Sequence, residues 1–190
     1  EALSVIRALW TEEPASFHGK YYSIDEAPMM PKPVQKPHPP IIVGGLGERS
    51  MRVAAKHATD YNQITSLEEV RANIVKFQAI CDETGRDPAE LRYSVQLQLR
   101  LSDDKADVDA YIERLTAIYL DGASHSLSEK YPDLESQVRD SMLWGSIEDV
   151  KEQVGRWTGA GVTHFILTTP RPFDRTMMER FASEVMPAFA

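Results

Sequence analysis

The chain has 190 residues, of which 42% are hydrophobic and 26% are charged, a composition typical of a globular protein with one core. Its formal net charge of -8 argues against nucleic-acid binding, since phosphate backbones are bound by clustered Lys and Arg, and no apolar run approaches the roughly 20 residues that cross a bilayer. With Cys81 as the single cysteine, no internal disulfide can form. We therefore expect a cytoplasmic protein that acts on a small molecule, not on nucleic acid or a membrane.

The first part of the chain predicts a helix, a long connection and a strand. Residues 2–10 have an amphipathic helical pattern, with no initiator Met or capping residue before it. Residues 11–35 are rich in Pro and aromatic side chains, which predicts an ordered extended connection with a turn over residues 17–22. Residues 41–43 are wholly apolar and are followed by Gly44 and Gly45, a pattern typical of a parallel strand covered on both faces.

The middle of the chain alternates between helical and extended patterns. Helical spacing over residues 48–58 precedes a short strand at 61–64. Ser66 and Glu69 predict a capping box that opens a helix ending near Gly85. A third strand is predicted at 92–101, and a helix over 104–120 is stopped by Gly122.

The last third of the chain is predicted to contain one further strand. Residues 124–132 are polar and irregular, and residues 133–142 favour a short helix. Ser146 caps the next helix, which runs through Trp157, and residues 163–169 form the fourth strand. A final helix is predicted over residues 174–186.

Four alternations of strand and helix predict right-handed βαβ units and a parallel α/β sheet. A complete (β/α)8 barrel needs roughly 250 residues, so a barrel of this length is incomplete. A four-stranded flavodoxin-like sheet is the geometric alternative. Because the chain opens directly into a helix, we expect a fragment: one domain, residues 1–190, forming the C-terminal half of a (β/α)8 TIM barrel.

The most informative local pattern is the turn that follows residues 41–43. Glycines allow a positive φ and close approach of a ligand, and the free amides and dipole of a helix N-terminus favour an anion. Gly44, Gly45, Leu46 and Gly47 therefore predict a phosphate-binding turn, to which Arg49 could add charge. We expect Val at Gly45 or Gly47 to introduce backbone strain. A tight βα turn also needs glycine, and the pattern is neither a Walker loop nor a complete Rossmann fingerprint.

Several motifs in a fixed order resemble the luciferase-like monooxygenase family, and most closely its F420-dependent oxidoreductase members. The order is Trp10; Phe17-x-Gly19-x-Tyr21-Tyr22; Pro31-x-Pro33-x-Gln35-x-Pro37-x-Pro39-Pro40; the strand and turn at 41–47; Ala54-Ala55-x-x-Ala58; and Asn62. It continues through Gly85-Arg86-Asp87-Pro88, Gly145-Ser146-x-Glu148-x-Val150 and Gly159-x-Gly161-Val162. The sequence departs from the family pattern at residues 59–62, where the family usually has an acidic residue, a small residue and Trp before the Asn.

The resemblance implies a barrel enzyme with FMN or F420 at the C-terminal ends of its strands. It implies that Gly44, Gly45, Leu46 and Gly47 hold the cofactor phosphate. The family's ring-side catalytic groups lie mainly in the first half of the barrel, so no catalytic residue is assigned in this chain. We expect the chain to form a homodimer or to require the rest of its barrel, because half a barrel exposes strand edges.

Other candidate residues lie later in the chain. In the loop after the fourth strand, Arg171 and Arg175 are candidates for binding an anionic substrate or cofactor tail. Along the third strand, Gln96, Gln98 and Arg100 alternate with apolar residues and could line a pocket or a wet barrel interior. No pair of histidines has metal-ligand or triad spacing, so no metal site is predicted.

The leading functional hypothesis is a flavin- or deazaflavin-dependent oxidoreductase, to which this chain contributes the phosphate-binding half. A noncatalytic truncated barrel that acts as a binding or assembly module is the alternative. A phosphosugar isomerase or aldolase would share the Gly-rich turn. It would also need a catalytic Lys or Glu at a strand end, and none is found.

Overall fold

The structure, a computed structural model, describes residues 1–122, 133–169 and 173–190. Its helices are α1 (Ala2–Thr11), α2 (Glu48–His57), α3 (Leu67–Thr84), α4 (Lys105–Gly122), α6 (Leu134–Asp140), α7 (Ile147–Gly159) and α8 (Arg175–Arg180). A 3-10 turn covers Pro88–Glu90, and the chain ends in a π-helical turn (Phe181–Val185) and a 3-10 turn (Met186–Phe189). The strands are β1 (Ala15–His18), β2 (Ser23–Ala27), β3 (Ile42–Gly44), β4 (Asp60–Gln63), β5 (Arg92–Leu101), β6 (Met142–Gly145) and β7 (His164–Thr168).

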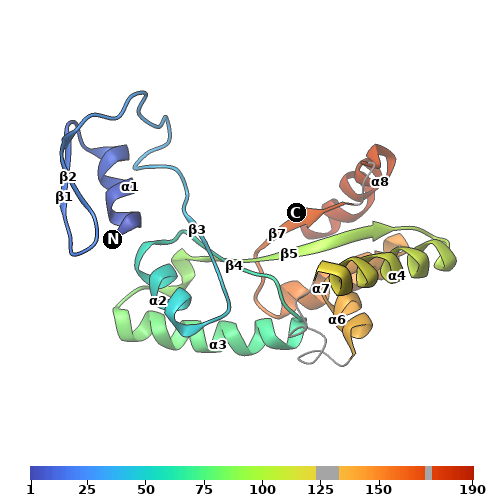
Figure 1. Cartoon of the computed structure of the whole chain (residues 1–190). Coiled ribbons are helices and arrows are strands. Elements are labelled where there is room, and N and C mark those ends of the chain that lie inside the picture. Colours follow the sequence, from blue (N-terminus) through green and yellow to red (C-terminus); the bar gives the residue numbers. More distant parts are fainter. Residues whose placement is uncertain (123–132, 170–172) are drawn as a thin grey trace.

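Five parallel strands form the central sheet, and the long strand β5 organises it (Figure 1). Strands β4 and β7 both pair with Ser94 and Val95, so they lie on opposite edges of β5. Gln98 pairs with both β6 and β7, so these two strands also lie on opposite edges of β5. Strand β6 is therefore on the same edge of β5 as β4, beyond the C-terminal end of β4. The four barrel-type strands β3, β4, β5 and β7 are therefore neighbours in chain order.

This strand order excludes the flavodoxin-like alternative, in which the order reverses at a switch point. Right-handed crossovers that all proceed in one direction place their helices on one face of the sheet. In agreement, the main core joins alternate strand residues such as Tyr61, Val95 and Leu97 to buried residues of α2, α3 and α7. The predicted α/β architecture of half a barrel is confirmed in its strand order and its single helical face.

In the part of the chain that the structure describes, the opposite face of the sheet is polar and has no helical layer along most of its length. The register aligns Gly44, Asn62, Ser94 and His164 in one row across this face. Ile42, on the same face, is half exposed. The prediction that residues 41–43 form a strand covered on both faces is therefore wrong for the described part of the chain, because only the helical face is covered.

A second, smaller core reveals a segment inserted between β5 and the helix that covers it. Buried residues of α4, α6 and β6 pack together in this core, apart from the main one: Val108, Tyr111, Ile112, Leu115, Val138 and Met142. Helix α7 packs in the main core instead, through Ile147, Val150, Val154 and Trp157. The sheet-covering helix after β5 is thus α7, and α4, α6 and β6 form what we call the insertion (Figure 1).

The structure also corrects the reading of residues 133–145. A helix was expected to continue to residue 142, but α6 ends at Asp140 and Met142–Gly145 is strand β6. The expected turn at residues 17–22 joins β1 and β2, which form a separate antiparallel hairpin beside α1. Among the helices of the described ranges, none combines the length and apolarity needed to cross a membrane.

Caps confirm the predicted ends of α3 and the predicted start of α7. Ser66 accepts a hydrogen bond from the Glu69 amide, and Gly85 closes α3 with a φ of 69°. The reciprocal bond from Glu69 is not among the hydrogen bonds of the described residues, so this box is half formed. Ser146 and Asp149 form a complete capping box at α7, and Asp174 caps α8.

Candidate functional site

The Gly-rich turn links the end of β3 to the start of α2. Gly45 has a φ of 144°, and a Cβ there would lie 2.6 Å from the Ser50 hydroxyl, so this position requires glycine. The Gly45 amide donates to the Asn62 carbonyl at 3.2 Å, and the Gly45 carbonyl accepts from the Tyr61 hydroxyl at 2.5 Å. Strand β4 thus fixes the turn through the two peptide groups that flank Gly45.

Gly47 does not have the conformational constraint predicted for it. It is the N-cap of α2 with a φ of -90°, and a Cβ built on it has no neighbour within 4 Å. The expectation that Val at Gly47 would strain the backbone is therefore wrong, because this conformation is open to any residue. A requirement for glycine at Gly47 could come only from a ligand that approaches it.

The N-terminus of α2 has unsatisfied amide donors. No side chain caps it, and the first backbone bond returning to Gly47 comes from the Met51 amide at 3.1 Å. The amides of Glu48, Arg49 and Ser50 therefore have no intrahelical acceptor. Free donors together with the positive end of the helix dipole can bind an oxyanion.

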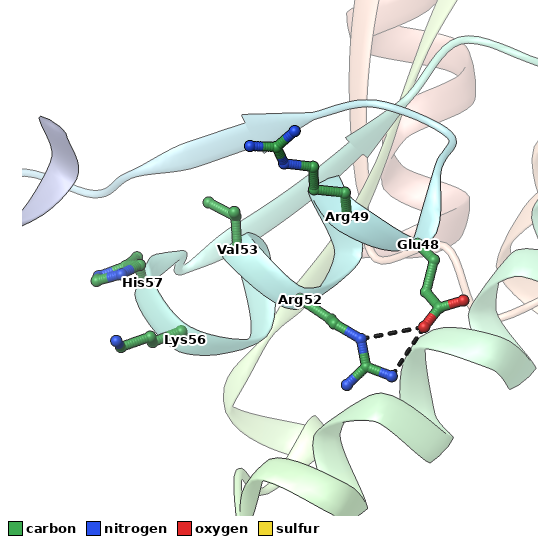
Figure 2. Close-up of a pocket in the computed structure, with 6 residues that line it drawn as sticks. All are labelled: Glu48, Arg49, Arg52, Val53, Lys56 and His57. Carbon is green, nitrogen blue, oxygen red and sulfur yellow. Dashed lines mark hydrogen bonds and ion pairs between the residues drawn. The ribbon is translucent and has the colours of Figure 1, made fainter. Parts of the chain in front are cut away.

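The charged side chains on α2 support such a role. Arg52 hydrogen-bonds to the Glu48 carboxylate at 2.8 and 3.0 Å, which offsets part of the charge of the one acidic group in the first turn (Figure 2). Arg52 also hydrogen-bonds to Glu83 at 2.9 Å, so two carboxylates share this guanidinium. In the described part of the chain, no ion pair involves Arg49 or Lys56. Both line an open groove of about 570 Å³ along α2. Figure 2 shows Arg49 extending over the face that also carries Val53 and His57.

A pocket of about 440 Å³ lies at the C-terminal ends of β3 and β4, beneath the insertion. Leu46 of the Gly-rich turn forms part of its wall, as do Ile64, Thr65 and Ser66 of the loop after β4. The insertion and the start of α3 complete the lining with Glu68, Glu69, Tyr119, Leu134, Gln137, Val138, Asp140 and Ser141. In parallel α/β folds this end of the strands is where ligands bind.

The polar residues of β5 hold the insertion in place. The Tyr111 hydroxyl of α4 donates to Gln98 at 3.2 Å, and Arg100 forms an ion pair with Asp107. The Arg100 guanidinium also lies 5.7 Å from the centre of the Tyr111 ring. These contacts give Gln98 and Arg100 a structural role at the junction with α4. Gln96, the third predicted polar residue of this strand, is aligned with Ile166 of β7.

A buried carboxylate at the other end of the sheet was not anticipated from sequence. Asp60 is fully buried, lies 2.7 Å from Nδ1 of His164 and 3.3 Å from Nε of Arg92, and accepts a hydrogen bond from Ser94. Because Asp60 lies between Ser94 and His164, the histidine cannot act as a base for the serine, as a nucleophilic triad would require. This cluster is at the N-terminal ends of the strands, where buried polar networks stabilise a barrel.

The remaining predicted residues lie away from the turn or outside the described ranges. Arg171 lies outside the described residues. Arg175, in the first turn of α8, is exposed and pairs with Glu179 at 2.7 Å. Among the residues that the structure describes, no three His, Cys, Asp or Glu side chains gather as metal ligands.

Comparison with known proteins identifies the family. The profile of the family described as luciferase-like monooxygenase matches residues 1–164, so the chain belongs to this family. The chain is 32% identical over 87 residues to the FMNH(2)-dependent dimethylsulfone monooxygenase of Pseudomonas putida, an alignment that covers 45% of this chain and 24% of that protein. It is 32% identical over 107 residues to the F420-dependent hydroxymycolic acid dehydrogenase of Mycobacterium tuberculosis, covering 56% of this chain and 29% of the relative.

The fold is shared with solved enzymes. The coenzyme F420-dependent tetrahydromethanopterin reductase from Methanopyrus kandleri superposes with a TM-score of 0.80 at 18% identity, over 98% of this chain and 61% of that one. The chain therefore spans less than two thirds of the length of each of these three relatives. The names of these relatives include both predicted cofactors, FMN and F420.

Proposed function

We propose that the protein containing this chain is a flavin- or deazaflavin-dependent oxidoreductase, in which this chain supplies the cofactor-phosphate half of a (β/α)8 barrel. The observation that carries the proposal is the N-terminus of α2, which follows the turn at Gly45 and has no side-chain cap. Family membership supports it, because relatives are named for FMNH(2) and for F420. When bound, the cofactor supplies the redox chemistry.

The chain's own residues bind and orient the cofactor in this proposal. The amides of Glu48, Arg49 and Ser50 donate to the phosphate. Tyr61 and Asn62 hold Gly45, in the turn that precedes these residues, through its carbonyl and its amide. Arg52 hydrogen-bonds to the Glu48 carboxylate, and its positive charge reduces the repulsion between this carboxylate and the phosphate. Arg49 carries a free positive charge that could turn toward the phosphate.

The cofactor is identified by titration. The protein expressed from its complete gene is titrated with FMN and, separately, with F420, and visible absorbance is recorded. We expect one of the two to bind with micromolar or tighter affinity. Absence of binding by both would contradict the proposal and favour a noncatalytic binding or assembly module.

The charge of Arg49 is tested in the same titration. We expect Arg49→Ala to weaken binding of the cofactor at low salt and to have less effect at high salt, because added ions screen an exposed charge. Lys56→Ala, on the same groove but two turns further along α2, is the matched control. Equal effects of the two substitutions would mean that Arg49 has no specific contact with the phosphate.

A further inference from the structure

The lining of the pocket beneath the insertion has an apolar part and an acidic part. Its apolar part consists of Leu46, Ile64, Tyr119, Leu134 and Val138. Its titratable part is acidic, with Glu68 and Glu69 from the first turn of α3 and Asp140 from the end of α6. None of the described residues that line it is Lys, Arg or His. A volume of about 440 Å³ is within the range of small-molecule pockets.

Among the described residues, no cation forms an ion pair with Glu68 or Glu69. No ion pair or side-chain hydrogen bond from Glu68 or Glu69 occurs within the described ranges. The hydrogen bonds of the described residues include the one from the Glu69 amide to Ser66 and none from the Ser66 amide to the Glu69 carboxylate, so this carboxylate does not have the capping role predicted for it. Asp140 also borders a neighbouring cavity lined by Arg139 and Arg156, so the two glutamates carry most of the argument.

The dipole of α3 does not reverse this balance. A helix N-terminus is equivalent to about half a positive charge, whereas Glu68 and Glu69 contribute two full negative charges. A carboxylate or phosphate in this pocket would be repelled. An ammonium group would be attracted and could also lie over the Tyr119 ring, which is 43% exposed.

We infer that this pocket binds an amphiphilic organic amine, with the apolar body against Leu46, Ile64 and Val138 and the ammonium group beside Glu68 and Glu69. This names a substrate class for the proposed oxidoreductase and rests on that function only for the statement that the amine is a substrate. The lining differs from that of the groove along α2, where Arg49 and Lys56 lie. The pocket and the groove are thus suited to ligands of opposite charge.

The test uses three probes that share one apolar body: 4-phenylbutylamine, 4-phenylbutanol and 4-phenylbutyrate. Binding to the protein expressed from its complete gene is measured by calorimetry and by saturation-transfer NMR. We expect the amine to bind about tenfold more tightly than the carboxylate at low salt, with the alcohol between them and the difference reduced by added salt.

Two variants localise the binding. Glu69→Gln should weaken the amine about threefold and leave the alcohol unchanged, as expected for loss of one partly exposed ion pair. Glu152→Gln, an exposed position on α7 outside the pocket, is the matched control and should change neither. Ile64→Trp places a large side chain at an exposed position in the wall and should block all three probes.

The inference is overturned by equal affinities for amine and carboxylate, by no binding of any probe, or by full binding to Ile64→Trp. The FMN and F420 titrations on the same sample separate this result from the proposed function. Amine binding without cofactor binding would refute the oxidoreductase and leave the pocket assignment standing. Cofactor binding without a preference for the amine would refute the pocket assignment and leave the proposed oxidoreductase standing.

Discussion

Tyr61 determines where the Gly-rich turn lies. Its ring is fully buried and stacks on Phe77 with centroids 4.6 Å apart, and its hydroxyl reaches the Gly45 carbonyl. Burial raises the pKa of Tyr61, so the hydroxyl keeps its proton and remains a donor. The sequence departs from the family pattern at this residue, and the structure shows that the departure supplies an anchor for the turn.

We expect Tyr61→Phe to lower the free energy of unfolding by ~1 kcal/mol, because the Gly45 carbonyl loses its buried partner. Cofactor affinity should fall with it, since the turn becomes less well held. Urea unfolding and cofactor titration measure the two effects. Tyr21→Phe, at an exposed site, is the control, and a Tyr61 variant that behaves like it would show that the hydroxyl does not position the turn.

Substitution of the two turn glycines separates strain from ligand contact. Gly45→Val should cost ~1–3 kcal/mol of stability through its positive φ and should weaken cofactor binding as a consequence. Gly47→Val should leave stability nearly unchanged, since a Cβ there meets nothing. It should still weaken cofactor binding, by tenfold for each 1.4 kcal/mol lost from contact with the phosphate.

Circular dichroism melts and cofactor titrations on both variants make this comparison. Gly155→Val, at a helical glycine of α7 with an equally open Cβ position, controls for the added side chain. Normal cofactor affinity in Gly47→Val would mean that no phosphate approaches this residue. The turn would then be structural, and the cofactor assignment would be wrong although the family assignment is unaffected.

At the scale of elements, the sequence predicted features that depend on a few neighbouring residues better than features that depend on contacts between distant residues. The turn at residues 44–47 and the caps at Ser66 and Ser146 were found because each pattern lies within a few residues. Strand β6 was missed because four residues between a helix and a capping serine show no alternation. The sequence also could not indicate that α4 belongs to a separate core, since helical periodicity does not specify a packing partner.

In the candidate site too, local features were predicted and features built from distant residues were not. The Gly-rich turn was predicted, but the pocket beside it joins Leu46 to Val138, which are far apart in sequence. The Asp60 cluster was missed for this reason too, because His164 lies 104 residues away from Asp60. Strand register and the position of the insertion bring these groups together, and neither can be read from spacing along the chain.

The ion pair between Arg100 and Asp107 makes the attachment of the insertion sensitive to acid. Hydrogen bonding to Arg100 holds the pKa of Asp107 below its usual value. The stabilisation is therefore complete above the ordinary carboxyl pKa of ~3.9 and is lost as the pH falls through the lower pKa of the folded state. We expect Asp107→Asn to cost ~1 kcal/mol at neutral pH and progressively less in acid.

Urea unfolding between pH 3 and pH 7 measures this difference, with Asp121→Asn in the last turn of the same helix as the control. A difference between wild type and Asp107→Asn that stays constant with pH would show that the ion pair does not contribute in the expected way. Loss of amine-probe binding in Asp107→Asn would further link the position of α4 to the pocket.

For the whole molecule, the open sheet is the dominant feature. Within the described ranges, β3 pairs only with β4 and β7 only with β5, so one edge of each strand is unpaired. The polar face is not covered, and exposed apolar side chains such as Ile42 lie on it. Unpaired edges and uncovered sheet faces promote association with other chains.

We expect residues 1–190 expressed alone to be poorly stable and to dimerise, aggregate or require further barrel strands. Light scattering, a thermal melt and binding of a hydrophobic dye report on this behaviour. The protein from the complete gene is the control and should melt cooperatively. A cooperative melt of a dilute monomer of residues 1–190, without dye binding, would contradict the half-barrel interpretation.

The separate core of the insertion has a consequence for how this enzyme family could diversify. Helices α4 and α6 lie between β5 and β6 in the chain, and their buried residues pack on one another and on Met142. Strand β6 itself pairs with β5, and its Leu143 belongs to the main core. The sequence of α4 and α6 can therefore change, or be exchanged for another of different length, with little disturbance to the packing of the sheet. A lineage could in this way alter α4 and α6 while inheriting the Gly-rich turn and the strands of the sheet unchanged.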